Sequence, residues 1–168
     1  MKFLAVFVTG LSLAIQAEAA CPTVDQIRTW IKKQGITLDK TVFYTSPYST
    51  NRDAMNYANK INGKFWGNVY PNDQLYEWLG ECGPGTAQDD LAPRMSEALA
   101  RETTGSAYIL LKKGTTPRPA SVFMVYEYPN LNVKVYAVNP EDLDETKEWT
   151  PDTNWKRAVS FGDVPVLG

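Results

Sequence analysis

The stretch Ser106-Ala107-Tyr108-Ile109-Leu110-Leu111 decides the fold class, because it is a continuous apolar run of strand length placed between Gly105 and a polar, proline-containing loop. Such a run is typical of a strand that is covered on both faces. Residues 41–45 (Thr-Val-Phe-Tyr-Thr) have the same character, and residues 121–127 and 133–138 are also predicted to be strands. The sequence therefore predicts a short sheet of about four strands.

Helical patterns fill the chain between these runs. Apolar residues recur at helical spacing in four segments, which begin after Thr23, after Ser49 or Thr50, at Asn72, and at Asp89 or Asp90. The order is one helix, one strand, three helices and three strands. This order predicts a small α/β domain with helices packed on a short, mostly parallel sheet.

The first nineteen residues have the composition of a secretory signal peptide. Lys2 gives a positive start, residues 3–15 are mostly apolar, and Ala17-Glu18-Ala19 fits a small-x-small cleavage site. The apolar stretch is too short to span a bilayer comfortably. The sequence predicts a secreted, extracellular protein in which residues 20–168, about 149 residues, form a single domain.

Cys21 and Cys82 are the only cysteines in the chain. In an oxidising compartment, two cysteines most simply form one disulfide. The closed loop is long, so the bond contributes roughly 3–4 kcal/mol in the loop-entropy description. A free-thiol catalyst is the weaker alternative, because the chain has no histidine to activate it.

The absence of histidine narrows the possible chemistry. Ser-His-Asp and Cys-His catalysis, His-ligated zinc sites and histidine-dependent ribonuclease chemistry are excluded. The net charge of −2 gives no support for binding to nucleic acid or to an anionic membrane. Any catalysis must use carboxylates, hydroxyls, basic side chains or backbone groups. Five tryptophans and nine tyrosines can pack in a core or stack on a flat ligand.

Glu127 is the acidic residue that most needs an explanation. It is the only charged residue between Arg118 and Lys134, and it ends the predicted strand 121–127. Removing an ionised acid from water is costly unless the acid is paired, hydrogen-bonded or neutralised. Two interpretations remain open: a carboxylate at the lip of a pocket, or a solvated charge at a sheet edge.

Several segments, in order, resemble those of the ADP-ribosyl cyclase and NAD glycohydrolase family, including related secreted toxin domains. The resemblance covers roughly residues 41–138. Residues 42–45 lie where the family has a strand ending in Trp-Ser, and residues 72–79 lie in the region of its acidic Thr-Leu-Glu-Asp segment. The helix containing Ser96 resembles the family's Phe-Trp-x-x-x-Ser helix. The segment Val125-Tyr126-Glu127-Tyr128-Pro129-Asn130-Leu131 resembles the one that holds the catalytic glutamate.

The resemblance implies cleavage of the bond between nicotinamide and ribose, with NAD as a substrate and with no cofactor or metal. It assigns Glu127 to stabilising positive charge on the ribose, Ser96 to phosphate contact and Tyr44 to stacking. No arginine directly follows Tyr44. Arg52 or Arg94 would therefore have to serve the phosphates.

The sequence departs from the family where an aromatic wall is expected. The tryptophan of the family's second motif falls at Leu91-Ala92 in this chain. Trp66 and Trp78 are the candidate replacements, although both also suit a core. The several disulfides of the animal enzymes are absent, which resembles the toxin-like branch.

Asp73 is the acid nearest to the family's acidic segment, which lacks its glutamate here. The helix dipole alone also favours an acid in the first turn of a helix. Asp73 or Glu77 would be the partner of Glu127 in a glycosidase, a third class of enzyme that needs two acids at a defined separation.

Two functions of different classes follow from these observations. The first is a secreted NAD-cleaving toxin or effector that acts on a small-molecule nucleotide. The second is a catalytically inactive secreted effector or binding module that contacts a host or competitor protein. Its contact surface would be aromatic, formed around Tyr48, Phe65, Trp66 and Tyr70.

Overall fold

The computed structural model describes residues 21–151, without the side chains of residues 86–88. The predicted signal peptide and Trp155 lie outside the described residues. The strands are β1 (Lys40–Tyr44), β2 (Lys64–Phe65), β3 (Ser106–Leu110), β4 (Lys134–Asn139) and β5 (Asp142–Glu148). The helices are α1 (Val24–Lys33), α2 (Asn51–Ile61), α3 (Trp66–Val69), α4 (Asn72–Cys82), α5 (Thr86–Glu102) and the short turns η1 (Phe123–Glu127) and η2 (Tyr128–Asn130).

The strands form one sheet in the order β2-β1-β3-β4-β5. Strands β2, β1, β3 and β4 are parallel, and β5 pairs antiparallel with β4. The predicted α/β class and the mostly parallel sheet are confirmed. The sheet has five strands rather than about four. The short β2 was predicted only as a turn-rich segment, and β5 lies in a region whose charged residues hide the strand pattern.

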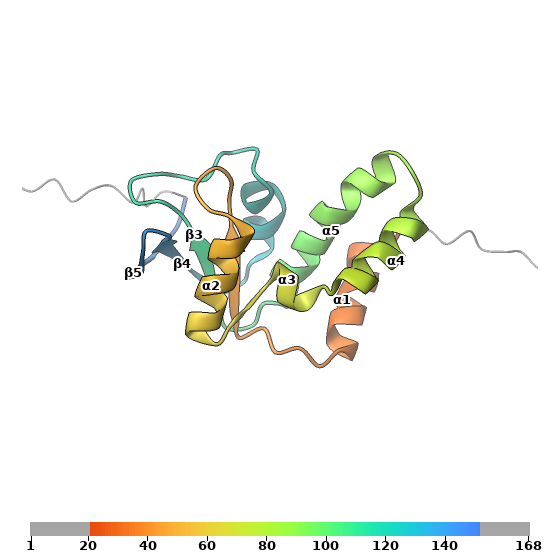
Figure 1. Cartoon of the computed structure of the whole chain (residues 1–168), viewed down its shortest axis with the longest axis horizontal. Coiled ribbons are helices and arrows are strands. Elements are labelled where there is room, and N and C mark those ends of the chain that lie inside the picture. Colours follow the sequence, from red (N-terminus) through yellow and green to blue (C-terminus); the bar gives the residue numbers. More distant parts are fainter. Residues whose placement is uncertain (1–20, 152–168) are drawn as a thin grey trace, which may run out of the picture.

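Helices cover both faces of the sheet. The alternation of side chains along β1 sends Val42 towards α2 on one face and Phe43 towards α1, α4 and α5 on the other. Figure 1 shows α1, α4 and α5 together on one side of the molecule, with α2 beside the strands on the other side. The larger core therefore lies on the face of the sheet that α1, α4 and α5 cover. None of the helices among residues 21–151 is both long and apolar enough to cross a membrane.

The segment 121–127 is helical, so its prediction as a strand was wrong. Ser121 starts the turn: its carbonyl accepts from the Val125 N–H at 3.0 Å, and its hydroxyl accepts from the Met124 N–H at 3.3 Å. Phe123 and Glu127, four residues apart, are buried on the inner side of the turn. The β-branched and aromatic composition favours a strand locally, but burial of Phe123 against Phe43 at 6.1 Å overrides that preference.

Local capping explains where the first helices begin. Thr23 and Gln26 form the predicted capping box of α1. Thr50, one of the two predicted caps, forms a second capping box with Asp53 at α2. Helix α5 starts three residues before the predicted Asp89, and Pro93 therefore lies inside the helix rather than in its first turn.

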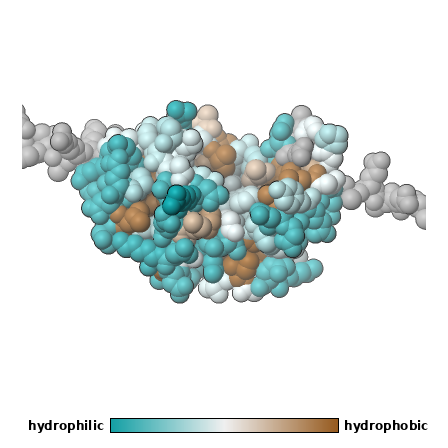
Figure 2. All heavy atoms as spheres, in the orientation of Figure 1, coloured by the Kyte–Doolittle hydropathy of each residue, from teal (hydrophilic) through white to brown (hydrophobic). Residues whose placement is uncertain are grey.

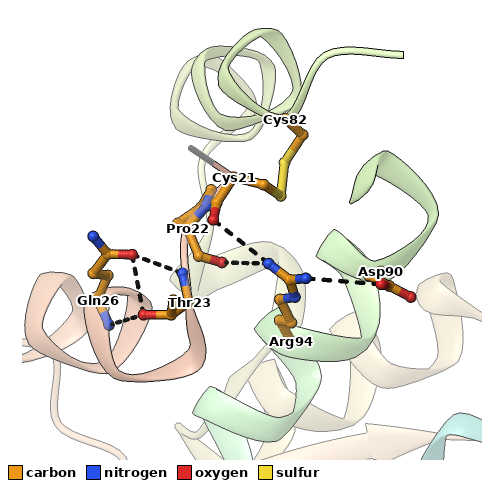
Figure 3. Close-up of a disulfide and its surroundings, with 7 residues drawn as sticks. All are labelled: Cys21, Pro22, Thr23, Gln26, Cys82, Asp90 and Arg94. Atoms are coloured by element: carbon orange, nitrogen blue, oxygen red, sulfur yellow. Dashed lines mark hydrogen bonds and ion pairs between the residues drawn. A yellow bond between two sulfur atoms is a disulfide. The ribbon is translucent and has the colours of Figure 1, made fainter. Parts of the chain in front are cut away.

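The predicted disulfide between Cys21 and Cys82 is present and joins the start of the described chain to the last residue of α4. Figure 3 shows Arg94 of α5 beside it, where the guanidinium donates to the carbonyls of Cys21 and Pro22 and pairs with Asp90 at 3.7 Å. The bond therefore belongs to a cluster that holds α4, α5 and the approach to α1 together.

Reducing the disulfide is expected to destabilise the protein by about 4 kcal/mol, because the two cysteines are separated by 61 residues and the bond restricts a long loop in the unfolded chain. Urea unfolding with and without reductant measures the change. A Cys21→Ala/Cys82→Ala variant is the control, and reductant should not alter its unfolding midpoint. A thiol titration that finds two free thiols per unreduced chain would contradict the bond.

Candidate active site

The order of the strands places a crevice at the carboxyl end of β1. After β1 the chain forms β2 on one side of β1, and it then crosses over to form β3 on the other side of β1. The strand order therefore reverses between β1 and β3. Ligands of open α/β sheets bind outside the carboxyl ends of strands at such a point. A cavity of about 690 Å³ lies there, between the end of β1, helix α5 and the turn η1. Its size suits a small organic ligand.

Glu127 lies in the lining of this cavity, at the end of η1. Only 7% of its surface is exposed, and its Oε2 atom is buried without a hydrogen-bond partner among the described residues. Burial raises the pKa of Glu127 to about 8, although the Ser96 hydroxyl beside the carboxyl lowers it in part. A buried carboxyl with an unused oxygen is costly to keep unless a ligand group meets it.

Ser96 and Tyr44 line the same cavity as Glu127. Ser96 is buried on α5, and Tyr44 is the last residue of β1 with 38% of its surface exposed. Partial burial raises the pKa of Tyr44, and the negative charge of Glu127 adds to the rise. The fold therefore brings together three residues that are widely separated in sequence.

Thr45, which the sequence interpretation did not assign a role, is also in the lining. Its hydroxyl oxygen is buried and has no hydrogen-bond partner among the described residues. The Ser49 hydroxyl accepts from the Thr45 N–H at 3.1 Å and donates to the Leu110 carbonyl at 2.8 Å, which ties the turn after β1 to the end of β3. Thr45 and Glu127, which both line the cavity, thus each hold a buried oxygen atom without a hydrogen-bond partner among the described residues.

The two tryptophans proposed as aromatic walls have different positions. Trp66 is half-buried on α3 and lines the cavity, with its edge against Tyr70 at 5.2 Å. Trp78 is buried in the core against Trp30 and does not line the cavity. Ala92 also lines the cavity, at the position where the resemblance leads one to expect an aromatic wall.

Arg118 is the cation that the structure adds to the site. It belongs to the loop before η1, lines the cavity and makes no ion pair within residues 21–151. Of the two predicted phosphate-binding arginines, Arg94 is engaged beside the disulfide and Arg52 is exposed, and neither lines the cavity. A loop arginine carries no local sequence signal, so only the folded arrangement brings Arg118 to the site.

Asp73 does not join the other predicted residues. It is an exposed acid in the first turn of α4 and lies outside the cavity lining, as does Glu77. Glu127 is the only acid among the described residues that line the cavity. The paired acids that a glycosidase needs are therefore not assembled around Glu127. Within residues 21–151, no group of acidic or cysteine side chains is placed to hold a metal ion.

The prediction of an exposed aromatic contact surface was wrong. Phe65 and Tyr70 are buried, and Tyr48 and Trp66 are only half-exposed. The Tyr70 hydroxyl donates to the Met95 carbonyl at 2.7 Å inside the core, and burial raises its pKa well above the usual value. On the face shown in Figure 2, hydrophobic residues form several separate patches within a largely hydrophilic surface.

No protein-family model matches the chain, and no curated protein matches it either. Among solved structures, an Aplysia cyclase with the substrate NGD and the product cGDPR is similar at 18% identity and a TM-score of 0.47. A Glu-to-Ala mutant of ADP-ribosyl cyclase, and an ADP-ribosyl cyclase bound to N1-cIDPR, are each similar at 17% identity, with TM-scores of 0.47 and 0.46. The alignments cover 73% of this chain and 58%, 60% and 61% of the three structures, so the chain spans less than two thirds of their length.

Proposed function

We propose that the protein cleaves the glycosidic bond between nicotinamide and ribose in NAD or a closely related nucleotide. The observation that carries the proposal is Glu127: a buried carboxyl with an unused oxygen in a cavity that also contains Ser96, Tyr44 and Trp66. The sequence resemblance around Glu127 points in the same direction. Secretion is part of the proposal, and the disulfide is compatible with an oxidising compartment.

The reaction suits a site with one carboxylate and aromatic walls. When the C1′–N bond breaks, its electron pair passes to the pyridinium nitrogen and neutral nicotinamide leaves. Positive charge develops on C1′ and the ring oxygen, and the ionised Glu127 stabilises it. Water then attacks C1′ and releases a proton to the solvent, which gives ADP-ribose. Tyr44 and Trp66 are the aromatic residues of the lining on which nicotinamide would stack.

The raised pKa of Glu127 is compatible with this role. Before substrate binds, the carboxyl is largely protonated at neutral pH, because its pKa is about 8. A positively charged pyridinium ring placed beside it favours the ionised form and lowers the pKa. The substrate therefore helps to create the anion that stabilises its own transition state.

The direct test is release of nicotinamide from NAD by the purified protein without the predicted signal peptide. Turnover above that of a buffer blank supports the proposal. The absence of release at high enzyme concentration would contradict the proposal and would favour the alternative, a catalytically inactive effector or binding module on the same fold.

Arg118 is expected to bind the phosphate groups of the substrate, because it brings an unpaired positive charge to the same cavity as Glu127. Arg118→Ala should raise KM for NAD by about 10- to 100-fold, the loss expected for one charged hydrogen bond. The variant should leave KM for nicotinamide riboside, which has no phosphate, nearly unchanged. Steady-state kinetics with the two substrates measures both effects.

Arg52→Ala is the matched control, since Arg52 is exposed and outside the cavity lining. It should leave both KM values unchanged. Equal losses with NAD and with nicotinamide riboside in Arg118→Ala would show that Arg118 acts on the fold of the loop rather than on phosphate.

A further inference from the structure

The side chain of Asn130 connects the segment that carries Glu127 to helix α5, which carries Ser96. Its amide nitrogen donates to the Tyr126 carbonyl at 2.8 Å, and its amide oxygen accepts from Arg101 Nε at 3.0 Å. Arg101 is on α5, where its guanidinium pairs with Glu97 at 2.6 Å. One amide group therefore joins η1 to α5, the two elements that carry Glu127 and Ser96, and does so from outside the cavity lining.

The bond to Tyr126 replaces a helical backbone bond. In an α-helix the carbonyl of residue 126 would accept from the N–H of residue 130, and here the side chain of the same residue makes that contact. Pro129 has no N–H, so the Val125 carbonyl lacks the donor that residue 129 would supply in an α-helix. The Tyr128 N–H donates to the Phe123 carbonyl, five residues back. Such π-helical turns are frequent at functional sites.

The bond to Arg101 sets the position of this turn relative to α5. Burial of Phe123 already anchors η1 in the core, and the bond to Arg101 adds a directional polar contact to α5 near Glu127. The planar Arg101 guanidinium is itself held by Glu97 one turn earlier on α5. The chain of contacts from Glu97 through Arg101 and Asn130 to Tyr126 ends at the residue before Glu127.

We propose that Asn130 is a positioning residue that holds the Glu127 carboxyl at the cavity wall beside Ser96. The proposal rests on the proposed function for its effect on catalysis, while its effect on Glu127 itself does not depend on turnover. Loss of the amide donor frees the Tyr126–Glu127 peptide, so that the carboxyl can turn towards water. A misplacement of the order of 1 Å is enough to reduce a rate by about 100-fold.

Two substitutions separate the roles of the amide. Asn130→Asp keeps the acceptor for Arg101 but removes the donor to Tyr126, and Asn130→Ala removes both. Both variants should lower kcat for nicotinamide release by about 10- to 100-fold, with KM for NAD changed much less. Asn132→Asp is the control, because Asn132 is exposed and lies two residues from Asn130. The substitution introduces the same negative charge as Asn130→Asp. It should retain the kcat of the wild type.

A second measurement tests the position of Glu127 without turnover. Carbon-13 NMR titration of the labelled glutamate carboxyls, assigned with Glu127→Gln, should place the wild-type Glu127 near pH 8. In both Asn130 variants the Glu127 titration should move towards the ordinary range, because the carboxyl gains water. Thermal unfolding establishes that each variant is folded.

The two measurements test the role of Asn130 separately from the proposed NAD-cleaving function. An inactive wild type overturns the proposed function, and the NMR titration then decides the role of Asn130. If Asn130→Asp had the same Glu127 titration and the same kcat as the wild type, the positioning role of the amide donor would be overturned, even if Asn130→Ala were impaired. An equal fall in kcat for Asn132→Asp would assign the effect to charge in general and would also overturn it.

Discussion

Replacing Glu127 by glutamine is expected to lower kcat for nicotinamide release by about 10²- to 10³-fold, because the amide cannot neutralise positive charge that develops on the ribose. Glutamine has nearly the same volume as glutamate, so the cavity and the packing of η1 should be preserved. KM for NAD should change far less, since the lost interaction strengthens only in the transition state. Steady-state kinetics of the wild type and of Glu127→Gln measures both constants.

The control for this prediction is Glu77→Gln. It makes the same substitution at an exposed position on α4, outside the cavity lining. The control should match the wild type in kcat and KM. Full activity in Glu127→Gln would remove Glu127 from the chemistry, and equal losses in both variants would point to net charge rather than to the site.

The same substitution is expected to stabilise the folded protein at alkaline pH. Burial raises the pKa of Glu127 from 4.5 to about 8, so between these values the folded state holds a proton that the unfolded state has released. The stability that Glu127 contributes is thus fully present below pH 4.5 and falls by ~1.4 kcal/mol for each pH unit up to about pH 8. Glutamine does not titrate and escapes this loss.

Glu127→Gln should therefore match the wild type near pH 4.5 and exceed it by on the order of 3–5 kcal/mol above pH 8. Urea unfolding at a series of pH values measures the difference. A difference that stays constant between pH 5 and pH 8 would contradict a buried, unpaired carboxyl. A site that sacrifices stability in this manner is typical of a group kept for function.

The helices and the central strands could be predicted because their signals are local. Thr23 with Gln26 and Thr50 with Asp53 close capping boxes within four residues, so nearby sequence is sufficient to start α1 and α2. The apolar runs at β1 and β3 are long enough to require burial on both faces. The disulfide follows from the presence of only two cysteines.

The segment that ends at Glu127 could not be assigned in the same way. Its Val, Phe and Tyr residues favour a strand, while the helical signals are weak: Ser121 at its start, and Pro129 with Asn130 at its end. The helical form is selected by burial of Phe123 between the sheet and Trp149, whose ring lies 5.6 Å away. That contact joins residues far apart in the chain, so it is not visible in a local pattern.

The sequence by itself determined the α/β class, the caps and the disulfide, and it singled out Glu127, Ser96, Tyr44 and Trp66 as candidates. Only the tertiary structure decided that these four line one cavity, that Thr45 and Arg118 join them, and that Asp73 does not. The physical reason is that caps and apolar runs act between near neighbours. A cavity, in contrast, is made where the end of a strand, a helix and a distant turn meet, and the unused oxygen of Glu127 exists only after that meeting has excluded water from it.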